Sequence, residues 1–251
     1  MQGVLTAITR SISPAMNRCE LVFLDRQAID IEQAAREHRA YEDALRELGV
    51  EVLSLRAEAE LPDSVFVEDP VVVLDEVAVM TRMGAESRRA EGESLAHALA
   101  PYREIRWMRE PATLEGGDVM RVGRTLYVGE SVRTNAEGIR QLGAFGYEVR
   151  GVPVRGCMHL KTGCTYLGDD SLLIDGDWID KANFPGMQFV NVVEPFSANI
   201  LRVGDTILIP DAFPRTVERL QERGFTVRTV GVSELMKAEA GLTCMSVLLN
   251  A

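Results

Sequence analysis

The alternation of apolar and polar residues along the chain predicts a repeated structural unit. Short apolar runs come in pairs separated by a polar or glycine-containing turn, which is the pattern of a β-hairpin. Four such hairpins are predicted, at residues 71–80, 118–128, 165–174 and 200–209. Their spacing falls within the period of about 20–50 residues that is typical of radially repeated or stacked structures.

A helical pattern and then a single strand follow most of these hairpins. The predicted helix and strand pairs are 88–100 with 104–108, 135–145 with 147–152, and 216–223 with 225–230. After the third hairpin, residues 178–186 are too few for a regular helix before a strand at 188–193. The unit is therefore strand, strand, helix, strand.

The N-terminal part of the chain predicts a further helix between two strands. Residues 4–8 have strand spacing, and serine and proline within 10–14 indicate a mobile loop. Residues 31–48 place apolar side chains every three or four positions, and Gly49 ends this helix. Residues 49–55 then alternate as a strand does.

The N-terminal strand and an apolar run after Cys244 belong to none of the four units, and together they would complete a fifth. Five units around a pseudo-symmetry axis form a small α/β propeller, which we expect to occupy residues 1–251 as one domain. A doubly wound sheet with a nucleotide loop is the weaker alternative, because no GxGxxG or Walker sequence follows a predicted strand.

Composition describes a globular chain, with 46% hydrophobic and 26% charged residues. No secretory leader and no run of about 20 apolar residues occurs, so we expect a cytoplasmic protein without a membrane partner. Four scattered cysteines do not form a disulfide framework in a chain of 251 residues, and reduced thiols are expected. The oligomeric state is left open between monomer and homodimer.

The net charge of −11 argues against a nucleic-acid partner, because phosphate backbones require clustered lysine and arginine. An acidic protein would suit a cationic substrate. Solubility is the commoner reason for such a charge.

Cys244 is a candidate nucleophile because it follows a small, turn-forming segment and precedes an apolar run. An inert buried thiol is the alternative interpretation of an isolated cysteine. A catalytic thiol needs a proton donor and acceptor, and His159 suits this role better than the two histidines within predicted helices. Glu115, before a Gly-Gly turn, could orient the imidazole and complete a Cys/His/Glu triad.

Charged residues next to apolar segments suggest a site for a zwitterion. Asp69 is flanked by apolar residues, so its carboxylate would need a cationic partner if buried; a solvated turn is the alternative. Arg82 and Arg133 each follow an apolar segment and could bind a carboxylate through both guanidinium branches. Carboxylates for a cation and arginines for an anion together suit an amino-acid ligand.

A metal site is not expected. Cys157, His159 and Cys164 are close in sequence, but no fourth ligand stands at zinc-finger spacing and no HExxH motif occurs. We predict neither metal nor cofactor.

Six motifs in order along the chain resemble those of the dimethylarginine dimethylaminohydrolase family, most closely its bacterial members. They are FVEDP at 66–70, TRMGAESRR at 81–89, EGGD at 115–118, RTN at 133–135, HLKT at 159–162 and LTCMS at 242–246. The resemblance covers almost the whole chain and implies the five-bladed pentein propeller of guanidino-modifying enzymes.

The resemblance also implies a reaction, the hydrolysis of an Nω-methylated arginine to citrulline and an alkylamine. Cys244 would attack the guanidinium carbon to form a covalent thiouronium, His159 would protonate the leaving amine and then activate water, and Glu115 would support His159. The implied substrate-binding positions are Asp69 at the guanidinium, Arg82 and Arg133 at the carboxylate, and Asp63, Glu68, Ala238 and, on an N-terminal lid, Leu21 around them.

Two departures from the family pattern concern substrate choice. Ala238 stands where a larger apolar residue usually touches substrate, and Ala240 replaces a glycine, whereas Met83 in place of proline affects loop stiffness. A related activity on arginine or another guanidino acid is therefore an alternative. A non-catalytic ribosome-binding factor with the same propeller is a more distant one, disfavoured by the complete catalytic set and the acidic charge.

Overall fold

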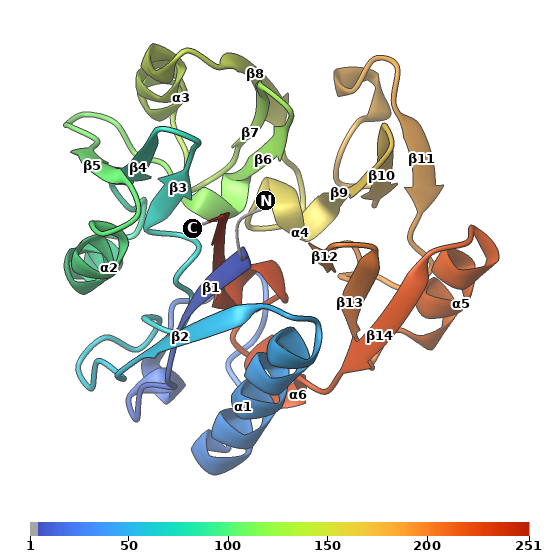
Figure 1. The fold of residues 1–251 in the computed structure, drawn as a ribbon, viewed down its shortest axis with the longest axis horizontal. Helices are drawn as coiled ribbons and strands as arrows, with labels where there is room; N and C mark the ends of the chain where they lie inside the picture. Colours follow the sequence, from blue (N-terminus) through green and yellow to red (C-terminus); the bar gives the residue numbers. More distant parts are fainter. Residues whose placement is uncertain (1–4, 251) are drawn as a thin grey trace.

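The computed structural model describes residues 5–250, which fold into five three-stranded sheets around a central axis (Figure 1). In each sheet an antiparallel pair of strands is extended by a third strand that runs parallel to the middle one. The predicted five-bladed α/β propeller and its four hairpins are thus confirmed.

Each sheet takes its strands from one repeat. In the order inner, middle, outer, the strands are β15 (Val247–Asn250), β1 (Leu5–Arg10) and β2 (Glu51–Leu55); β3 (Val71–Val73), β4 (Val77–Met80) and β5 (Glu104–Trp107); β6 (Val119–Val122), β7 (Thr125–Glu130) and β8 (Glu148–Pro153); β9 (Cys164–Gly168), β10 (Ser171–Ile174) and β11 (Gln188–Asn191); and β12 (Leu201–Val203), β13 (Thr206–Pro210) and β14 (Thr226–Val230).

Four helices connect the middle and outer strands of their sheets and lie at the periphery (Figure 1). They are α1 (Ile31–Glu47), α2 (Gly92–Leu99), α3 (Ala136–Leu142) and α5 (Pro214–Glu222). The remaining connection holds only a short 3₁₀ helix at Lys181–Asn183, as its length predicted. Within residues 5–250, no helix has the length and apolar character needed to cross a membrane.

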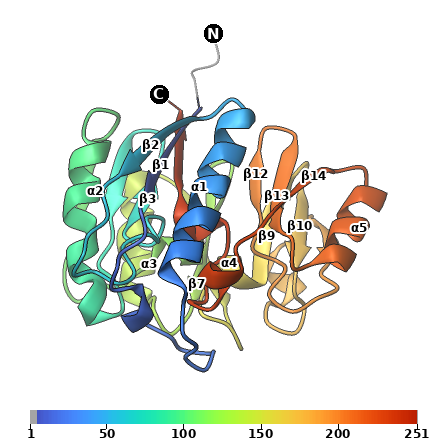
Figure 2. The same cartoon turned by 90° about the horizontal axis from the view of Figure 1, so that it is seen from below.

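The two ends of the described chain close the fifth sheet. Strand β1 lies between β15, to which it is antiparallel, and β2, to which it is parallel, and Figure 2 shows β1 and β15 along the middle of the molecule. The expected loop at 10–14 begins one residue late, because Arg10 still pairs with Leu55 in the ladder. Val4, expected in the same strand, lies outside the described residues.

Burial decreases from the axis to the rim. The middle strand β4 is buried along its whole length, whereas the outer strand β5 is largely exposed. Apolar side chains fill the spaces between sheets and helices, as Leu95 and Leu99 of α2 do beside Met80 of β4. Because neither face of β4 meets water, its sequence VAVM is a continuous apolar run.

Short helical segments near the axis carry the candidate catalytic residues and were not predicted. Helix α4 (Leu160–Gly163) follows His159, a 3₁₀ turn at Gly116–Asp118 follows Glu115, and another at Thr243–Met245 contains Cys244. Helix α6 (Ser233–Met236) was also missed. Segments of one turn are too short to show a hydrophobic period.

Helix α1 is tied directly to the segment that carries Cys244. The Tyr41 hydroxyl, fully buried, donates to the Leu242 carbonyl oxygen at 3.1 Å and shares a hydrogen bond of 2.7 Å with the Ser246 hydroxyl. Two hydrogen bonds from one residue therefore bracket Cys244.

We predict that Tyr41→Phe lowers the free energy of unfolding by about 1–3 kcal/mol, because it leaves buried polar groups of Leu242 and Ser246 without their partner. Urea unfolding followed by circular dichroism measures this. Tyr102→Phe is the matched control, since Tyr102 is partly exposed and its hydroxyl makes no hydrogen bond within residues 5–250. Equal losses in the two variants would contradict the assignment.

Candidate active site

A small cavity at the axis brings together side chains from six separate stretches of the chain. Its volume is about 20 Å³. It is lined by Glu20, Asp63, Phe66, Asp69, Arg88, Arg133, Met158, His159, Ala238, Glu239, Ala240 and Cys244. Most of the residues expected to act on substrate therefore converge on this cavity.

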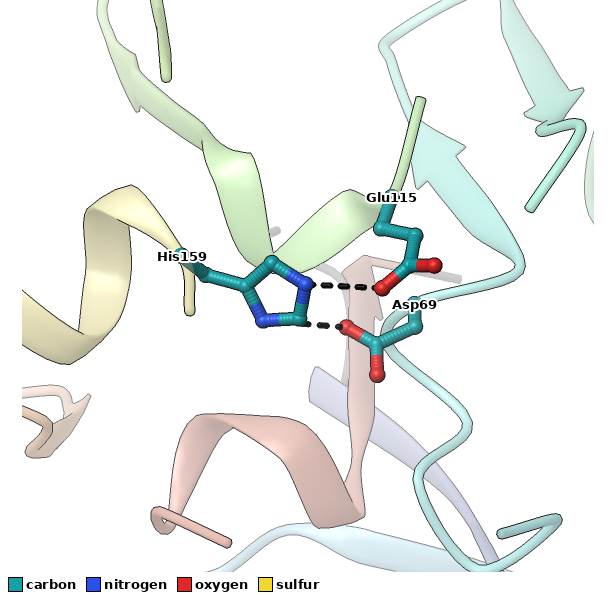
Figure 3. A group of neighbouring side chains, drawn as sticks. All are labelled: Asp69, Glu115 and His159. Atoms are coloured by element: carbon teal, nitrogen blue, oxygen red, sulfur yellow. Dashed lines mark hydrogen bonds and ion pairs between the residues drawn. The ribbon is translucent and has the colours of Figure 1, made fainter. Parts of the chain in front are cut away.

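His159 lies between two buried carboxylates (Figure 3). Its Nε2 is 2.8 Å from Oε2 of Glu115, and its Nδ1 is 4.0 Å from Oδ1 of Asp69. Close approach requires glycine at position 117, because a Cβ there would lie 2.6 Å from His159 Nδ1 and 2.8 Å from Asp69 Oδ1. The Gly-Gly turn thus admits the imidazole.

The pKa values of this pair move apart. Burial lowers the pKa of His159, but the charge of Asp69 and the hydrogen bond to Glu115 outweigh it and raise the pKa to about 9. Burial raises the pKa of Glu115, but the hydrogen bond and the charge of His159 outweigh it and lower the pKa to about 2. At neutral pH the pair is an imidazolium and a carboxylate.

Glu115 also has neighbours on its other oxygen. Its Oε1 accepts a hydrogen bond from the Gly84 amide at 3.1 Å and lies 3.8 Å from Nη1 of Arg133. Arg88 Nη1 is 3.9 Å from Oε2. A fully buried carboxylate with this many positive or donor neighbours remains ionised and holds the imidazole in one orientation.

Asp69 is buried at 3% exposure and has the cationic partner that its burial requires. Oδ2 accepts from Arg88 Nη1 at 3.0 Å, and Oδ1 accepts from the Gly117 amide at 3.2 Å. The solvated-turn interpretation of this residue is therefore wrong.

Arg88 is the cavity arginine that the sequence reasoning did not single out. Its Nε and Nη2 donate to both carboxylate oxygens of Glu91 at 2.9–3.2 Å, which leaves Nη1 for Asp69. Burial raises the pKa of Glu91 to about 7 against the lowering effect of Arg88. The spacing of Arg88 and Glu91, three residues apart on a helical turn, was the available signal for this pair.

Arg82 and Leu21, both expected at the substrate, do not line the cavity. The Arg82 guanidinium pairs with Glu110 at 2.5 Å and donates to the Ala112 carbonyl at 3.3 Å. Leu21 packs against the apolar cluster around helix α1, and its neighbour Glu20 reaches the cavity instead.

Cys244 is held in a 3₁₀ turn and is partly exposed to the cavity. Its carbonyl oxygen accepts from the Glu68 amide at 3.2 Å. Thr243, the residue before Cys244, donates through Oγ1 to Glu68 at 2.7 Å and through its amide to Asn199 at 3.0 Å. Glu68 in turn pairs with Lys161, so the expected binding residue Glu68 contacts the loop of the nucleophile and is not in the cavity lining.

The Cys244 thiol is protonated at neutral pH in the absence of a ligand. Burial and the negative charges of Asp69 and Glu68 raise its pKa to about 12. Formation of a thiolate in this site therefore needs an additional positive charge close to the sulfur.

Asp63 and Ala238 line the cavity together. Both Asp63 oxygens accept from the Glu20 amide, at 3.2 and 3.1 Å, and burial raises the pKa of this carboxyl. Ala238 is buried at 4% exposure, and its short side chain leaves room beside Cys244.

Asp118, completely buried, is a second residue of the site region that the sequence reasoning left without a role. It accepts from the Leu160 amide at 2.9 Å and from the hydroxyls of Ser131 and Thr134, both at 2.6 Å. It thereby fixes the start of helix α4 directly after His159. Its position after the Gly-Gly turn was the only local signal.

Asp69, Glu115 and His159 could also offer ligand atoms to a metal, since these atoms lie within 4.8 Å of one another. Arg88 is 3.0 Å from Asp69, and Arg133 is 3.8 Å from Glu115. A metal cation would have to compete with these guanidinium groups, so the group fits a metal poorly.

The propeller and its cysteine-containing axial cavity define a hydrolase of the pentein superfamily. A family model described as "N,N dimethylarginine dimethylhydrolase, eukaryotic" matches residues 15–183. The chain belongs to the dimethylarginine dimethylaminohydrolase family of guanidino hydrolases.

Relatives of this family match nearly the full length. The chain is 38% identical to the N(G),N(G)-dimethylarginine dimethylaminohydrolase of Streptomyces coelicolor over 97% of this chain and 96% of that protein. It is 37% identical to that of Pseudomonas aeruginosa over 86% and 89%. A solved structure of a cysteine-to-serine mutant of the P. aeruginosa protein with citrulline superposes with a TM-score of 0.93 and 33% identity, covering 99% of this chain and 100% of that one.

We predict that Glu115→Gln lowers the pKa of His159 from about 9, because a neutral amide replaces a carboxylate hydrogen-bond acceptor. NMR titration of the imidazole measures the shift. Glu93→Gln is the control, since Glu93 is exposed on helix α2. An unchanged His159 titration in Glu115→Gln would remove Glu115 from the pair.

The same pair makes stability depend on pH with a defined sign. The His159 pKa is raised in the folded protein, so its contribution is complete below about pH 6.5 and is lost as the pH rises through about 9. The Glu115 pKa is lowered, so its contribution is present above about 4.5 and is lost as the pH falls through about 2. We expect a loss of up to about 3 kcal/mol between pH 6.5 and 9 in urea unfolding, and a smaller loss in Glu115→Gln.

Proposed function

We propose that this protein hydrolyses Nω-methylated arginine, as asymmetric dimethylarginine or monomethylarginine, to citrulline and an alkylamine. The observation that carries the proposal is the convergence of Cys244, His159 and Asp69 on one axial cavity that also contains two arginines. Such a cavity offers a nucleophile, a proton donor and binding groups for both ends of a cationic amino acid.

The guanidinium group of the substrate supplies the charge that Cys244 lacks. Asp69 binds the guanidinium nitrogens and places this cation beside the sulfur. A positive charge there opposes the effect of Asp69 and Glu68 and lowers the pKa of the thiol, which is about 12 without substrate. The thiolate therefore forms when the substrate is in place, and the thiol proton passes to solvent water.

Carbon–nitrogen cleavage uses the second nitrogen of His159. The thiolate attacks the guanidinium carbon and forms a C–S bond. Because Nε2 is engaged by Glu115 at 2.8 Å, Nδ1 donates its proton to the leaving alkylamine as the C–N bond breaks. The product of this half-reaction is a thiouronium on Cys244.

The second half-reaction returns the enzyme to its starting state. His159, now neutral, takes a proton from water, and the oxygen attacks the thiouronium carbon. As the C–S bond breaks, the proton of the new hydroxyl group passes to the sulfur, and citrulline leaves with the new C=O group. No redox change occurs in either half.

The carboxylate of the amino acid is bound by Arg88 and Arg133, and its ammonium group by Asp63. Both arginines line the cavity, whereas Arg82 does not. Arg133 makes no hydrogen bond through its guanidinium within the described chain, so its donors are available to a carboxylate.

A citrulline assay across asymmetric dimethylarginine, monomethylarginine and arginine tests the reaction and its substrate. We expect citrulline from both methylated substrates, little from arginine, and none above background from Cys244→Ser. Activity on arginine alone would favour a deiminase-type reaction. Undiminished activity in Cys244→Ser would exclude this cysteine as the nucleophile.

Carboxylate binding is tested by Arg133→Ala. Loss of a charge-assisted hydrogen bond of about 1.5–3 kcal/mol should raise KM by roughly 10–100-fold with a smaller change in kcat. An N-methylated agmatine, which has no carboxylate, should show little change. Arg82→Ala is the matched control, because its guanidinium pairs with Glu110 away from the cavity. A KM that rises equally in the control would contradict the placement.

A further inference from the structure

The segment at residues 20–24 borders the cavity through Glu20, and its Phe23 and Leu24 border the apolar cavity beside it. The Glu20 side chain forms part of the cavity lining, and its amide donates to both oxygens of Asp63. The Ser87 hydroxyl donates to Glu20 Oε1 at 2.5 Å. Val22 and Phe23, farther along this segment, are exposed although apolar.

One carboxylate oxygen fastens this segment to the opposite wall. Oε1 of Glu239 accepts hydrogen bonds from three consecutive backbone amides, those of Val22 at 2.9 Å, Phe23 at 2.7 Å and Leu24 at 2.7 Å. Within residues 5–250 Glu239 forms no ion pair, and its buried Oε2 has no hydrogen-bond partner. The three amides are therefore the hydrogen-bond donors that stabilise the Glu239 carboxylate.

The backbone of Glu239 adopts a conformation that is unfavourable for a residue with a side chain. Its φ is +58°, in the left-handed region that favours glycine at the end of a helix, and it follows α6 closely. Glu239 lies between Ala238 and Ala240 in the stretch that leads to Cys244. Glu239 thus joins the segment at 20–24 to the stretch of chain that leads into Cys244.

The cavity volume requires the segment at 20–24 to move. A volume of about 20 Å³ holds little more than one water molecule, so an amino acid cannot enter while the segment is in place. Phe23, Leu24 and Glu239 also border an adjoining apolar cavity of about 100 Å³. The segment is therefore loosely packed next to its point of attachment.

We infer that Glu239 is a positioning residue that fastens the segment at 20–24 over the active site and must release its amides for substrate to enter. The inference rests on the proposed function in taking this cavity as the substrate site. Release breaks three hydrogen bonds at one carboxylate, whereas the hydrogen bonds of Glu20 to Asp63 and Ser87 hold the start of the segment.

Amide hydrogen exchange and alkylation of Cys244 test this in the protein without substrate. In Glu239→Gly, which suits the positive φ, we expect the amides of 22–24 to exchange about tenfold faster or more, with exchange elsewhere unchanged. Iodoacetamide should alkylate Cys244 faster by a similar factor, followed by mass spectrometry. Glu218→Gln, at an exposed position of helix α5, is the control and should match the wild type.

Each result decides the role of Glu239. Faster exchange confined to 22–24 together with faster alkylation supports it, and an intermediate effect in Glu239→Gln, which keeps one oxygen acceptor, supports it further. Unchanged exchange at 22–24, or faster exchange spread over the whole chain, overturns it. Neither readout uses turnover, so a negative citrulline assay would count against the proposed function and not against this inference.

Discussion

The hydrogen bond between His159 and Glu115 joins two ionised groups away from water, and the axis of the propeller is built around it. Buried charges are tolerated only when paired and hydrogen-bonded. Here Gly117 gives the imidazole room, Asp118 fixes the helix that follows it, and Arg133 flanks the carboxylate. The chemistry of the cavity depends on this pair remaining an imidazolium and a carboxylate at neutral pH.

Without a ligand, the cavity contains a protonated histidine and a protonated cysteine. Burial and, after it, the negative charges of Asp69 and Glu68 raise the pKa of Cys244, and of the two charges Asp69 has the larger effect. The same Asp69 raises the pKa of His159. One carboxylate therefore helps to keep His159 charged and the Cys244 thiol neutral, and under the proposed function a cationic substrate bound by that carboxylate would reverse only the second effect. In this protonated form the Cys244 thiol reacts slowly with alkylating agents.

Repetition in the sequence was sufficient to predict the fold, because each repeat carries its own hairpin, connection and outer strand. The site was less accessible to sequence reasoning. Arg82 and Arg88 stand in the same motif, and only the turn at Glu86–Glu91 shows that Arg88 reaches the cavity. The role of Glu239 depends on three backbone amides more than 200 residues away, which no local pattern reveals.

The other elements that the sequence did not predict are short ones near the axis. Helices α4 and α6 are single turns whose positions are set by tertiary hydrogen bonds, such as that from the Leu160 amide to Asp118. Hydrophobic periodicity needs several turns to be visible. The strand β1 likewise extends to Arg10 because of its pairing with Leu55, across a long stretch of sequence.

Because β1 pairs with β15, the fifth sheet can be completed only at the end of protein synthesis. The ribosome releases β1 first, yet this strand obtains its inner partner only when Val247–Asn250 has emerged. Cys244 lies immediately before that last strand. The other four sheets can form while translation continues. Cys244 reaches its final position only when β15 pairs with β1. A prematurely terminated chain would thus be left with an open fifth sheet and without the Cys244 thiol at its axis.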